Sequence, residues 1–380
     1  MRKIKLFTLS CFALALALLA ACGGGGDGDQ APKVKFTSLV SFGDSLSDFG
    51  THKVGEIAAA GGGKYTVNSA SAKNWTEILA SQLGLTAPCA AQTGGFGVGV
   101  AFDTSCTNYA QGGARVIHPF GPENINLGGA GQLTVPLTTQ MDNHLTVAAG
   151  SFTGKELVTV QAGANDLFMQ FGALTTLSAV VDVNTATTFT NYVVGVAGWT
   201  TNEATAVLTA AATSGAAAGI AAAAPIMVSK MTTAGTDLSG LVKTKLVANG
   251  AKYVLVLNLP NVSKTPFATS LGSADLVALL DSMTKAFNTS LQAGLAGAAG
   301  VKLGDAYTTN TDQFDHPSQY GLSNVTDTAC TGNSLVCSAA TVISGDISTY
   351  LFADGVHPTP YGYKLMAQEA AKYLVIAGWL

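Results

Sequence analysis

The sequence predicts an α/β fold with a central parallel β-sheet. Three apolar runs of strand length carry this prediction, namely residues 36–42, 156–162 and 252–258. Each run is closed by a turn-forming residue, and long segments that are compatible with helices separate the runs. Strands buried inside a parallel sheet read as continuous apolar runs, because crossover helices cover both faces of the sheet. We therefore expect these three runs to be parallel strands connected by helices.

Helical patterns occupy much of the sequence between and after these strands. Helices are expected over residues 73–83, 274–298 and 361–377. In the last of them, apolar side chains recur at steps of three and four, which predicts one face packed against the core. Two further segments, 114–150 and 172–240, are rich in Thr, Ala and Gly and poor in charge. We interpret these two segments as insertions into the fold.

The composition favours one large folded domain and excludes several classes of protein. Of the 380 residues, 48% are hydrophobic and 11% are charged, which provides enough apolar material for a large core. The net charge is −4 and no basic stripe is present, so we expect no nucleic-acid partner. The Ala-rich stretch 205–228 is the nearest match to a membrane span, but its Thr and Ser content and Pro225 favour a helix outside the membrane.

The first 21 residues predict an export signal rather than part of the fold. Arg2, Lys3 and Lys5 form a positively charged start, and the apolar residues 6–20 follow. This apolar run is shorter than the roughly 20 residues that cross a bilayer as a helix. We therefore assign residues 1–21 to a signal peptide.

The end of this signal resembles the lipobox of bacterial lipoproteins. Small residues precede Cys22 in the sequence LAAC at positions 19–22. The resemblance implies cleavage before Cys22 and attachment of lipid to it, so the protein would be anchored to a membrane. Gly23 follows the cysteine, and the absence of Asp there points to the outer membrane of a Gram-negative cell. Residues 22–35 then form a flexible tether. The alternative is an ordinary signal and a secreted protein.

Four cysteines follow Cys22, and their even number in an oxidising compartment predicts disulfides. They are Cys89, Cys106, Cys330 and Cys337. Three pairings are possible, and closure of the shorter loops favours Cys89–Cys106 and Cys330–Cys337. Metal binding is the alternative, but neither a C-x-x-C motif nor clustered histidines accompany these cysteines.

Chemistry-bearing residues follow the first two predicted strands. Residues 43–46 (GDSL) come after the first strand, and residues 163–166 (GAND) come after the second. Ligands bind at the carboxyl ends of strands in an open parallel sheet, so we expect these turns to lie side by side. Ser45 is a candidate nucleophile, and the amide of Asn165 can donate to an oxygen that becomes negative during acyl transfer.

A candidate base lies near the C-terminus. Asp354 precedes His357 by three residues across a glycine, so its carboxylate can accept the Nδ1 proton and leave Nε2 free to activate Ser45. His316 is a rival base, but it lacks the D-x-x-H spacing. The remaining histidines are expected on the surface or in loops: His52, His118 and His144.

Other polar residues near these turns receive structural roles. Asp166 is expected to cap a helix N-terminus, and Asp44 and Asp48 are expected to be structural hydrogen-bond acceptors. Neither an H-E-x-x-H motif nor a phosphate-binding G-x-x-x-x-G-K-[ST] loop occurs in the sequence. We therefore expect no metal and no cofactor.

Four segments together resemble the four sequence blocks of the GDSL (SGNH) esterase/lipase family, in the family's order. They are residues 41–48 (SFGDSLSD), 108–114 (NYAQGGA), 163–166 (GAND) and 354–358 (DGVHP). The resemblance implies a three-layer α/β/α, flavodoxin-like hydrolase fold with a central parallel sheet and loop and helix insertions over residues 36–380. The G-x-S-x-G elbow expected of the α/β-hydrolases does not occur in the sequence.

The resemblance also implies a role for each site residue. Ser45 is the nucleophile, His357 the base and Asp354 its partner, and the oxyanion hole consists of the Ser45 N–H, the Gly113 N–H and Asn165. Gly112 competes with Gly113 for this role, and the spacing from the start of the second block favours Gly113.

The implied activity is hydrolysis of carboxylic esters through an acyl-enzyme on Ser45. Residues 259–262 and 317–324 resemble the bacterial lecithinase/phospholipase branch, so fatty-acyl esters or phospholipids are the expected substrates. Removal of acetyl groups from carbohydrate and acyl transfer between lipids are alternatives. A membrane-anchored binding or adhesion protein on a degenerate hydrolase fold is the alternative outside catalysis. The sequence does not determine the oligomeric state.

Overall fold

The computed structural model describes residues 34–380, so the predicted signal peptide and Cys22 lie outside the described residues. Its central sheet has four parallel strands in the order β1-β4-β5-β6. The strands are β1 (Leu39–Gly43), β4 (Leu157–Gln161), β5 (Tyr253–Leu257) and β6 (Val301–Gly304). The first three confirm the predicted strands. The sequence reasoning missed β6, because this edge strand is only half-buried and Lys302 interrupts its apolar run.

Eleven α-helices accompany the sheet within residues 34–380. They are α2 (Gly55–Ala59), α3 (Trp75–Gln82), α4 (Leu137–Val147), α5 (Ala164–Ser178), α6 (Val183–Gly195), α7 (Thr201–Ser214), α8 (Ala216–Leu241), α9 (Pro266–Ser270), α10 (Ala274–Leu295), α11 (Ala306–Asp315) and α12 (Pro360–Ile376). Helices α3, α10 and α12 confirm the predicted ones. A capping box of Asn74 and Glu77 starts α3, and Thr359 followed by Pro360 starts α12.

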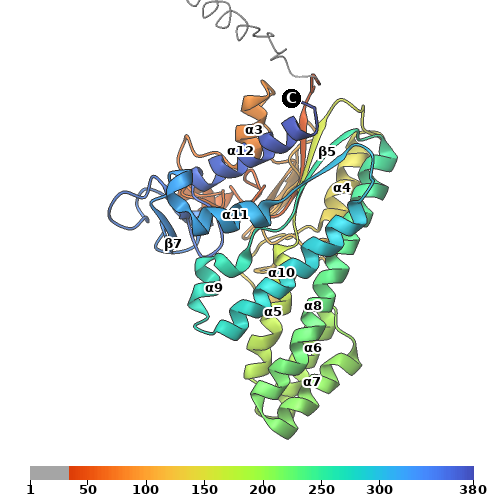
Figure 1. Cartoon of the computed structure of the whole chain (residues 1–380), viewed down its shortest axis with the longest axis vertical. Coiled ribbons are helices and arrows are strands. Elements are labelled where there is room, and N and C mark those ends of the chain that lie inside the picture. Colours follow the sequence, from red (N-terminus) through yellow and green to blue (C-terminus); the bar gives the residue numbers. More distant parts are fainter. Residues whose placement is uncertain (1–33) are drawn as a thin grey trace, which may run out of the picture.

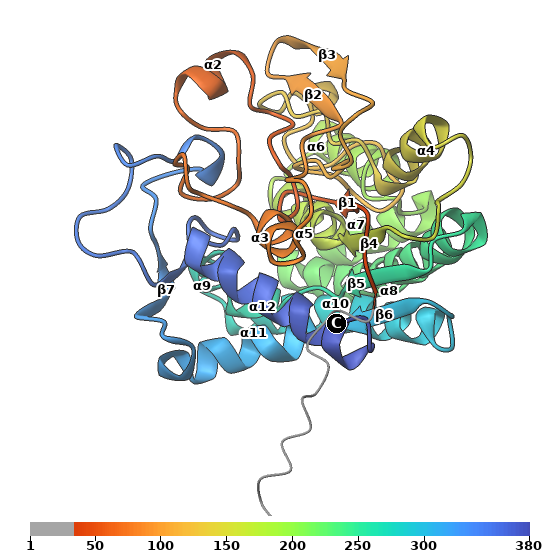
Figure 2. The same cartoon turned by 90° about the horizontal axis from the view of Figure 1, so that it is seen from above.

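Helices cover both faces of the sheet, which gives three layers (Figures 1 and 2). Alternate strand residues belong to two separate cores, as the two-residue period of a strand requires. Val40, Val158 and Val254 pack with α4, α5, α8 and α10, whereas Leu39 and Leu157 pack with α3 and α12. The observed architecture is therefore the α/β/α arrangement that the family resemblance implies.

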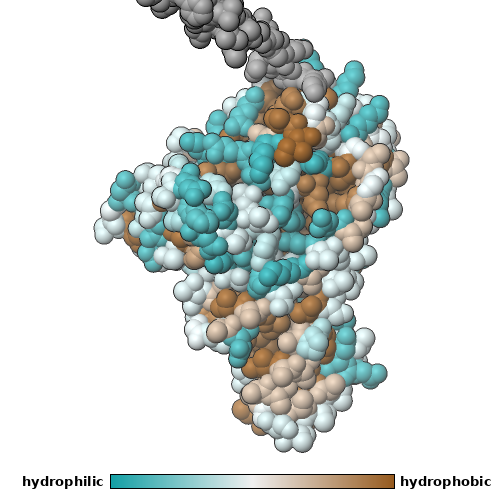
Figure 3. Space-filling view, in the orientation of Figure 1, coloured by the Kyte–Doolittle hydropathy of each residue, from teal (hydrophilic) through white to brown (hydrophobic). Residues whose placement is uncertain are grey.

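The segment 172–240 is a helical extension of this core. Helices α6, α7 and α8 and the end of α5 extend away from the sheet (Figure 1), and side chains of neutral to hydrophobic character cover most of their visible surface (Figure 3). The prediction of a single helix over 205–228 is wrong, because α7 and α8 divide this stretch between them. Gly215 separates α7 from α8 with a φ of 88°, which a glycine adopts readily and which ends a right-handed helix. Within the described residues, none of the helices combines the length and apolar character needed to cross a membrane.

Two small sheets flank the main one, and a disulfide accompanies each. The strands β2 (Gln92–Gly95) and β3 (Val98–Phe102) form an antiparallel hairpin, and β7 (Asn324–Thr328) pairs with β8 (Tyr350–Phe352) in parallel. Disulfides join Cys89 to Cys106 and Cys330 to Cys337, so both predicted pairings are confirmed.

Candidate active site

Ser45 lies in a sharp turn directly after β1. Gly43, the last residue of β1, permits this turn, because a Cβ atom there would lie 2.5 Å from the backbone oxygen of Gln161 on β4. The side chain of Gln140 fixes the same turn by donating to the Gly43 oxygen and accepting from the Gly43 N–H. The sequence thus places the hydroxyl of Ser45 at the carboxyl end of the sheet, where it lines a pocket of about 270 Å³.

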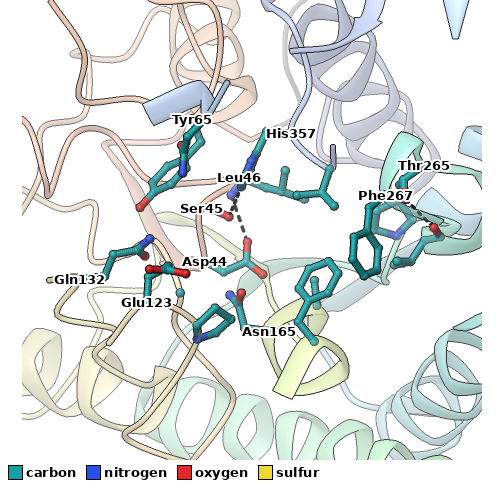
Figure 4. Close-up of a pocket in the computed structure, with 18 residues that line it drawn as sticks. Asp44, Ser45, Leu46, Tyr65, Glu123, Gln132, Asn165, Thr265, Phe267 and His357 are labelled. Atoms are coloured by element: carbon teal, nitrogen blue, oxygen red, sulfur yellow. Dashed lines mark hydrogen bonds between the residues drawn. The ribbon is translucent and has the colours of Figure 1, made fainter. Parts of the chain in front are cut away.

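Three predicted side chains meet at this point through hydrogen bonds, and Figure 4 shows two of them, Ser45 and His357. Nε2 of His357 lies 2.8 Å from Oγ of Ser45, although the two residues are 312 positions apart. Nδ1 of His357 lies 2.9 Å from both carboxylate oxygens of Asp354. This geometry assigns the proton to Nδ1 and leaves Nε2 as the acceptor facing Ser45. The arrangement can therefore move a proton from the serine hydroxyl to the imidazole.

The carboxylate of Asp354 remains ionised because its surroundings donate to it. Burial acts to raise its pKa, but the charge and hydrogen bond of His357, a hydrogen bond from Ser334 and the backbone N–H of Val356 together hold the pKa well below its usual range. The N–H of His357 also donates to the same carboxylate, at 2.8 Å. An ionised acceptor so constrained fixes the orientation of the imidazole.

Potential donors to a substrate oxygen line the pocket beside Ser45. Gly112 is excluded, because its N–H donates to Asp48 at 2.8 Å. Gly113 lines the pocket, and neither its N–H nor that of Ser45 donates to another group among residues 34–380. Asn165 lines the pocket as well, and its Nδ2 donates one of its two protons to the Ala114 oxygen at 2.8 Å, which leaves the second proton available.

Asp166 does not cap α5, so that prediction is wrong. Gly163 precedes the helix, and Asp166 lies in its first turn. The buried guanidinium of Arg115 donates to this carboxylate at 2.9 Å, and the Val116 N–H donates at 3.0 Å. A buried cation needs a paired anion, and this pairing outweighs a backbone cap. The ion pair connects the Gly113 segment to the helix that carries Asn165.

Asp44 and Asp48, both predicted to be structural, differ in their surroundings. Asp48 accepts from the N–H groups of Gly50, Thr51 and Gly112, which confirms its structural role. Asp44 accepts from Leu46, but its Oδ2 is buried without a hydrogen-bond partner in the described part of the chain. Burial raises the pKa of Asp44 to about 7, although the Leu46 hydrogen bond and the charge of His357 oppose this shift.

The other histidines lie away from Ser45, and the prediction of a surface or loop position is wrong for one of them, His144. His52 is fully buried but lies in a turn, as predicted, and its Nδ1 donates to the Gly94 oxygen at 2.9 Å. His144 is buried on α4 among the aromatic rings of Phe42, Tyr109 and Phe152. Burial lowers the pKa of His144, so its neutral ring packs there as an aromatic side chain. The rival base His316 is exposed and pairs with Asp312.

The sequence reasoning missed most of the residues that line the pocket. Apolar side chains form one part of it: Leu46, Pro260, Val262, Phe168, Phe267 and Val356. Tyr65, Glu123 and Gln132 form another part. Tyr65, Glu123 and Gln132 belong to loops without a recognisable motif, so only the folded chain brings these three residues together. No group of three or more His, Cys, Asp or Glu side chains within residues 34–380 is arranged to hold a metal ion.

Comparisons with known proteins identify relatives of this chain. Among curated proteins, the chain is similar to the GDSL esterase/lipase EXL2 of Arabidopsis thaliana, with 29% identity over 158 residues. The match covers 37% of this chain and 41% of the plant protein, so it spans about two fifths of that relative's length.

Two solved structures that are similar to this chain come from species of Streptomyces. The extracellular lipase of Streptomyces rimosus shares 16% identity with a TM-score of 0.43, over 89% of this chain and 99% of that chain. The phospholipase A1 of Streptomyces albidoflavus NA297 shares 14% identity with a TM-score of 0.41, also over 89% and 99% of the two chains. The family model of the GDSL-like lipases and acylhydrolases matches residues 39–370, nearly the whole described structure. The chain therefore belongs to the GDSL-like lipase/acylhydrolase family.

Proposed function

We propose that this protein hydrolyses carboxylic esters through an acyl-enzyme on Ser45. The observation that carries the proposal is the chain of contacts from Ser45 through His357 to Asp354, with distances of 2.8 and 2.9 Å. A hydroxyl within hydrogen-bond reach of a base, whose other nitrogen is held by a carboxylate, is the arrangement that activates a serine nucleophile.

Each step then has a defined proton path. The Oγ of Ser45 bonds to the ester carbonyl carbon while its proton passes to Nε2 of His357. The negative oxygen accepts hydrogen bonds from the N–H groups of Ser45 and Gly113 and from Nδ2 of Asn165. The carbon–alkoxy bond breaks and the leaving alcohol takes the proton from His357. Water adds to the acyl-enzyme by the same route, and the carboxylic acid leaves.

The lining of the pocket supports an apolar acyl group. Phe168 and Phe267 meet edge to face at 5.4 Å, and Val262 and Pro260 lie beside them in the same pocket. Burial of apolar surface contributes about 25 cal/mol per Å², so each added methylene that fits here strengthens binding. We therefore propose fatty-acyl esters as the substrates, including phospholipids whose headgroup carries no net negative charge.

One panel of assays tests both parts of this proposal. The purified wild type and the Ser45→Ala variant are assayed on nitrophenyl esters from acetate to laurate. Both proteins are also treated with a fluorophosphonate probe, which labels reactive serines. We expect the probe to label Ser45, the wild type to be most active on an acyl chain longer than acetate, and the variant to show activity near background. Substantial hydrolysis by Ser45→Ala overturns the mechanism. An optimum on acetate favours a carbohydrate acetyl esterase, and a folded protein that never labels favours a binding protein.

We also propose that residues 1–21 direct export and that Cys22 carries lipid, on the basis of the LAAC sequence at 19–22. Fatty-acid labelling of bacteria that express the full chain tests this proposal, with Cys22→Ala as the matched variant. Label on the wild type and none on the variant supports an anchored protein. An unlabelled wild type in the medium supports the secreted alternative.

A further inference from the structure

The pocket has two unlike sides, and Ser45 lies between them. Figure 4 shows Tyr65, Gln132 and Glu123 on one side of Ser45 and Phe267 on the other. All of these residues line the same pocket. An ester also has two unlike parts, its acyl chain and its alcohol. The apolar side matches the acyl chain, so the polar side is available to the alcohol.

The hydroxyl of Tyr65 is buried at this site without a partner. The side chain is 3% exposed, and its oxygen has no hydrogen-bond partner among the described residues. A Cβ atom on Gly112 would lie only 1.8 Å from that oxygen, so the hydroxyl lies directly against the backbone that leads to Gly113. Burial raises the pKa of Tyr65 well above its usual value, with smaller contributions from the charges of Asp48 and Asp354. The phenol is therefore a neutral group that can both donate and accept.

The amide of Gln132 adds a second buried group without a partner. The residue is 6% exposed, and its Oε1 finds no hydrogen-bond partner within residues 34–380. A Cβ atom on Gly113 would lie 2.9 Å from this oxygen, which places it against the second glycine of the same segment. The great majority of buried polar atoms in proteins are hydrogen-bonded. Two such atoms on one wall of a pocket point to a ligand that supplies the missing bonds.

Glu123 contributes a carboxylate at the exposed edge of this wall. Its backbone has a φ of 59°, which is uncommon for a residue other than glycine. The backbone oxygen of Glu123 accepts from the N–H groups of Gly131 and Gln132. The same turn therefore fixes the side chains of both Glu123 and Gln132 at the pocket. Its Oε2 accepts from Ala130 at 3.0 Å, and the ionised group retains further capacity to accept hydrogen bonds.

The position of His357 decides which part of the ester faces this wall. The leaving alcohol takes its proton from Nε2 of His357, so it must depart beside the imidazole. The ring of Tyr65 packs on that imidazole, with centroids 4.9 Å apart. Tyr65 and its neighbours therefore lie on the side from which the alcohol leaves.

We propose that Tyr65, Gln132 and Glu123 form a subsite for an alcohol that carries free hydroxyl groups, such as a glyceryl group. This inference rests on the proposed ester hydrolysis and identifies its alcohol class. Gln132 Oε1 and the Glu123 carboxylate are acceptors, so they require O–H donors on the ligand. The negative charge of Glu123 disfavours an anionic alcohol such as a glycerol phosphate. A simple alkyl alcohol leaves the two buried polar atoms unpaired, which lowers its rate of reaction.

Two esters that differ only in hydroxyl groups test the subsite. Glyceryl monobutyrate and propyl butyrate share the acyl group and a three-carbon alcohol, and the readout is the ratio of their kcat/KM values within each protein. We expect the wild type to favour the glyceryl ester by at least about tenfold. Tyr65→Phe and Gln132→Leu should each lower this ratio by about fivefold, the effect of one neutral hydrogen bond. Tyr192→Phe removes a hydroxyl that bonds to the Met169 oxygen on α5, and it should keep the wild-type ratio.

A third ester tests the charge. Glu123→Gln should improve hydrolysis of butyryl glycerol phosphate relative to glyceryl monobutyrate. The subsite is overturned if the wild type hydrolyses propyl and glyceryl butyrate equally, or if neither Tyr65→Phe nor Gln132→Leu changes the ratio. In that case hydrolysis of propyl butyrate that is lost in Ser45→Ala shows that the proposed function stands without the subsite. If the wild type hydrolyses none of the esters and Ser45 does not label, both the proposed function and this inference fail.

Discussion

The backbone N–H of Ser334 donates to Oδ2 of Asp354 at 3.0 Å. Ser334 lies between Cys330 and Cys337, and the Cys330 N–H donates to the Ala353 oxygen next to Asp354. The loop closed by this disulfide therefore supports the carboxylate that orients His357. In this way a structural crosslink far from Ser45 in the sequence acts on the geometry of the proposed active site.

Replacing both Cys330 and Cys337 by serine should lower kcat as well as stability. Opening a loop of this size removes about 2 kcal/mol of stabilisation, and a displaced carboxylate can lower kcat by up to about 100-fold. Steady-state kinetics measure the change in kcat, at a temperature where circular dichroism shows that both proteins are folded. Urea unfolding measures the change in stability. A folded variant with unchanged kcat would show that the loop does not position Asp354.

His357→Ala should reduce kcat by about 10⁴-fold or more, because the serine loses its base. His316→Ala is the matched control, since His316 is exposed and pairs with Asp312 away from the pocket. Hydrolysis of nitrophenyl butyrate by the two variants checks the assignment. The opposite ranking would make His316 the base and contradict the proposed mechanism.

Asn165→Ala should lower kcat by about 10²–10³-fold with little change in KM. A donor to the oxyanion acts mainly in the transition state, so its loss affects kcat more than ground-state binding. The hydrogen bond from Asn165 to the Ala114 oxygen is also lost, so the melting temperature should be recorded in parallel. A kcat within threefold of the wild type would remove Asn165 from the oxyanion hole.

Asp44 should make stability fall as pH rises from about 4 to about 7. Its pKa is about 7 in the folded protein and near 3.8 when unfolded, so the folded state keeps a proton that the unfolded state has released. The favourable contribution is complete below pH 4 and is lost as pH passes through 7. Urea unfolding across this range should show a smaller loss for Asp44→Asn than for the wild type. Parallel stability curves for the two proteins would exclude this titration.

His144 should have the opposite effect at acidic pH. Burial lowers its pKa to about 4 from about 6.5, while the charge of Glu156 opposes the shift. The folded state therefore binds this proton only at lower pH than the unfolded state, and stability falls as pH drops from 6.5 to 4. His144→Phe, which keeps an aromatic ring among Phe42, Tyr109 and Phe152, should flatten this loss in thermal unfolding. An equally steep acid loss in the variant would contradict the prediction.

The sequence by itself determined the parts of this protein that depend on short stretches of chain. The apolar runs of β1, β4 and β5 were predictable because strands buried inside a sheet carry continuous apolar side chains. The turn at Ser45 and the D-x-x-H pairing of Asp354 with His357 were also predictable, because each depends on only a few neighbouring residues. The edge strand β6 was not, because a half-exposed strand carries no such run.

Only the tertiary structure decided which distant groups meet. The motif spacing favours Gly113 over Gly112, but the hydrogen bond that occupies the Gly112 N–H joins it to Asp48, 64 positions away, and only the fold brings these two residues together. The pairing of Asp166 with Arg115, and the wall formed by Tyr65 and Gln132, likewise join loops that lie far apart in the chain. Such contacts are selected by packing and by the need to pair buried polar groups. Both are properties of the folded chain as a whole, so local sequence patterns carry little trace of them.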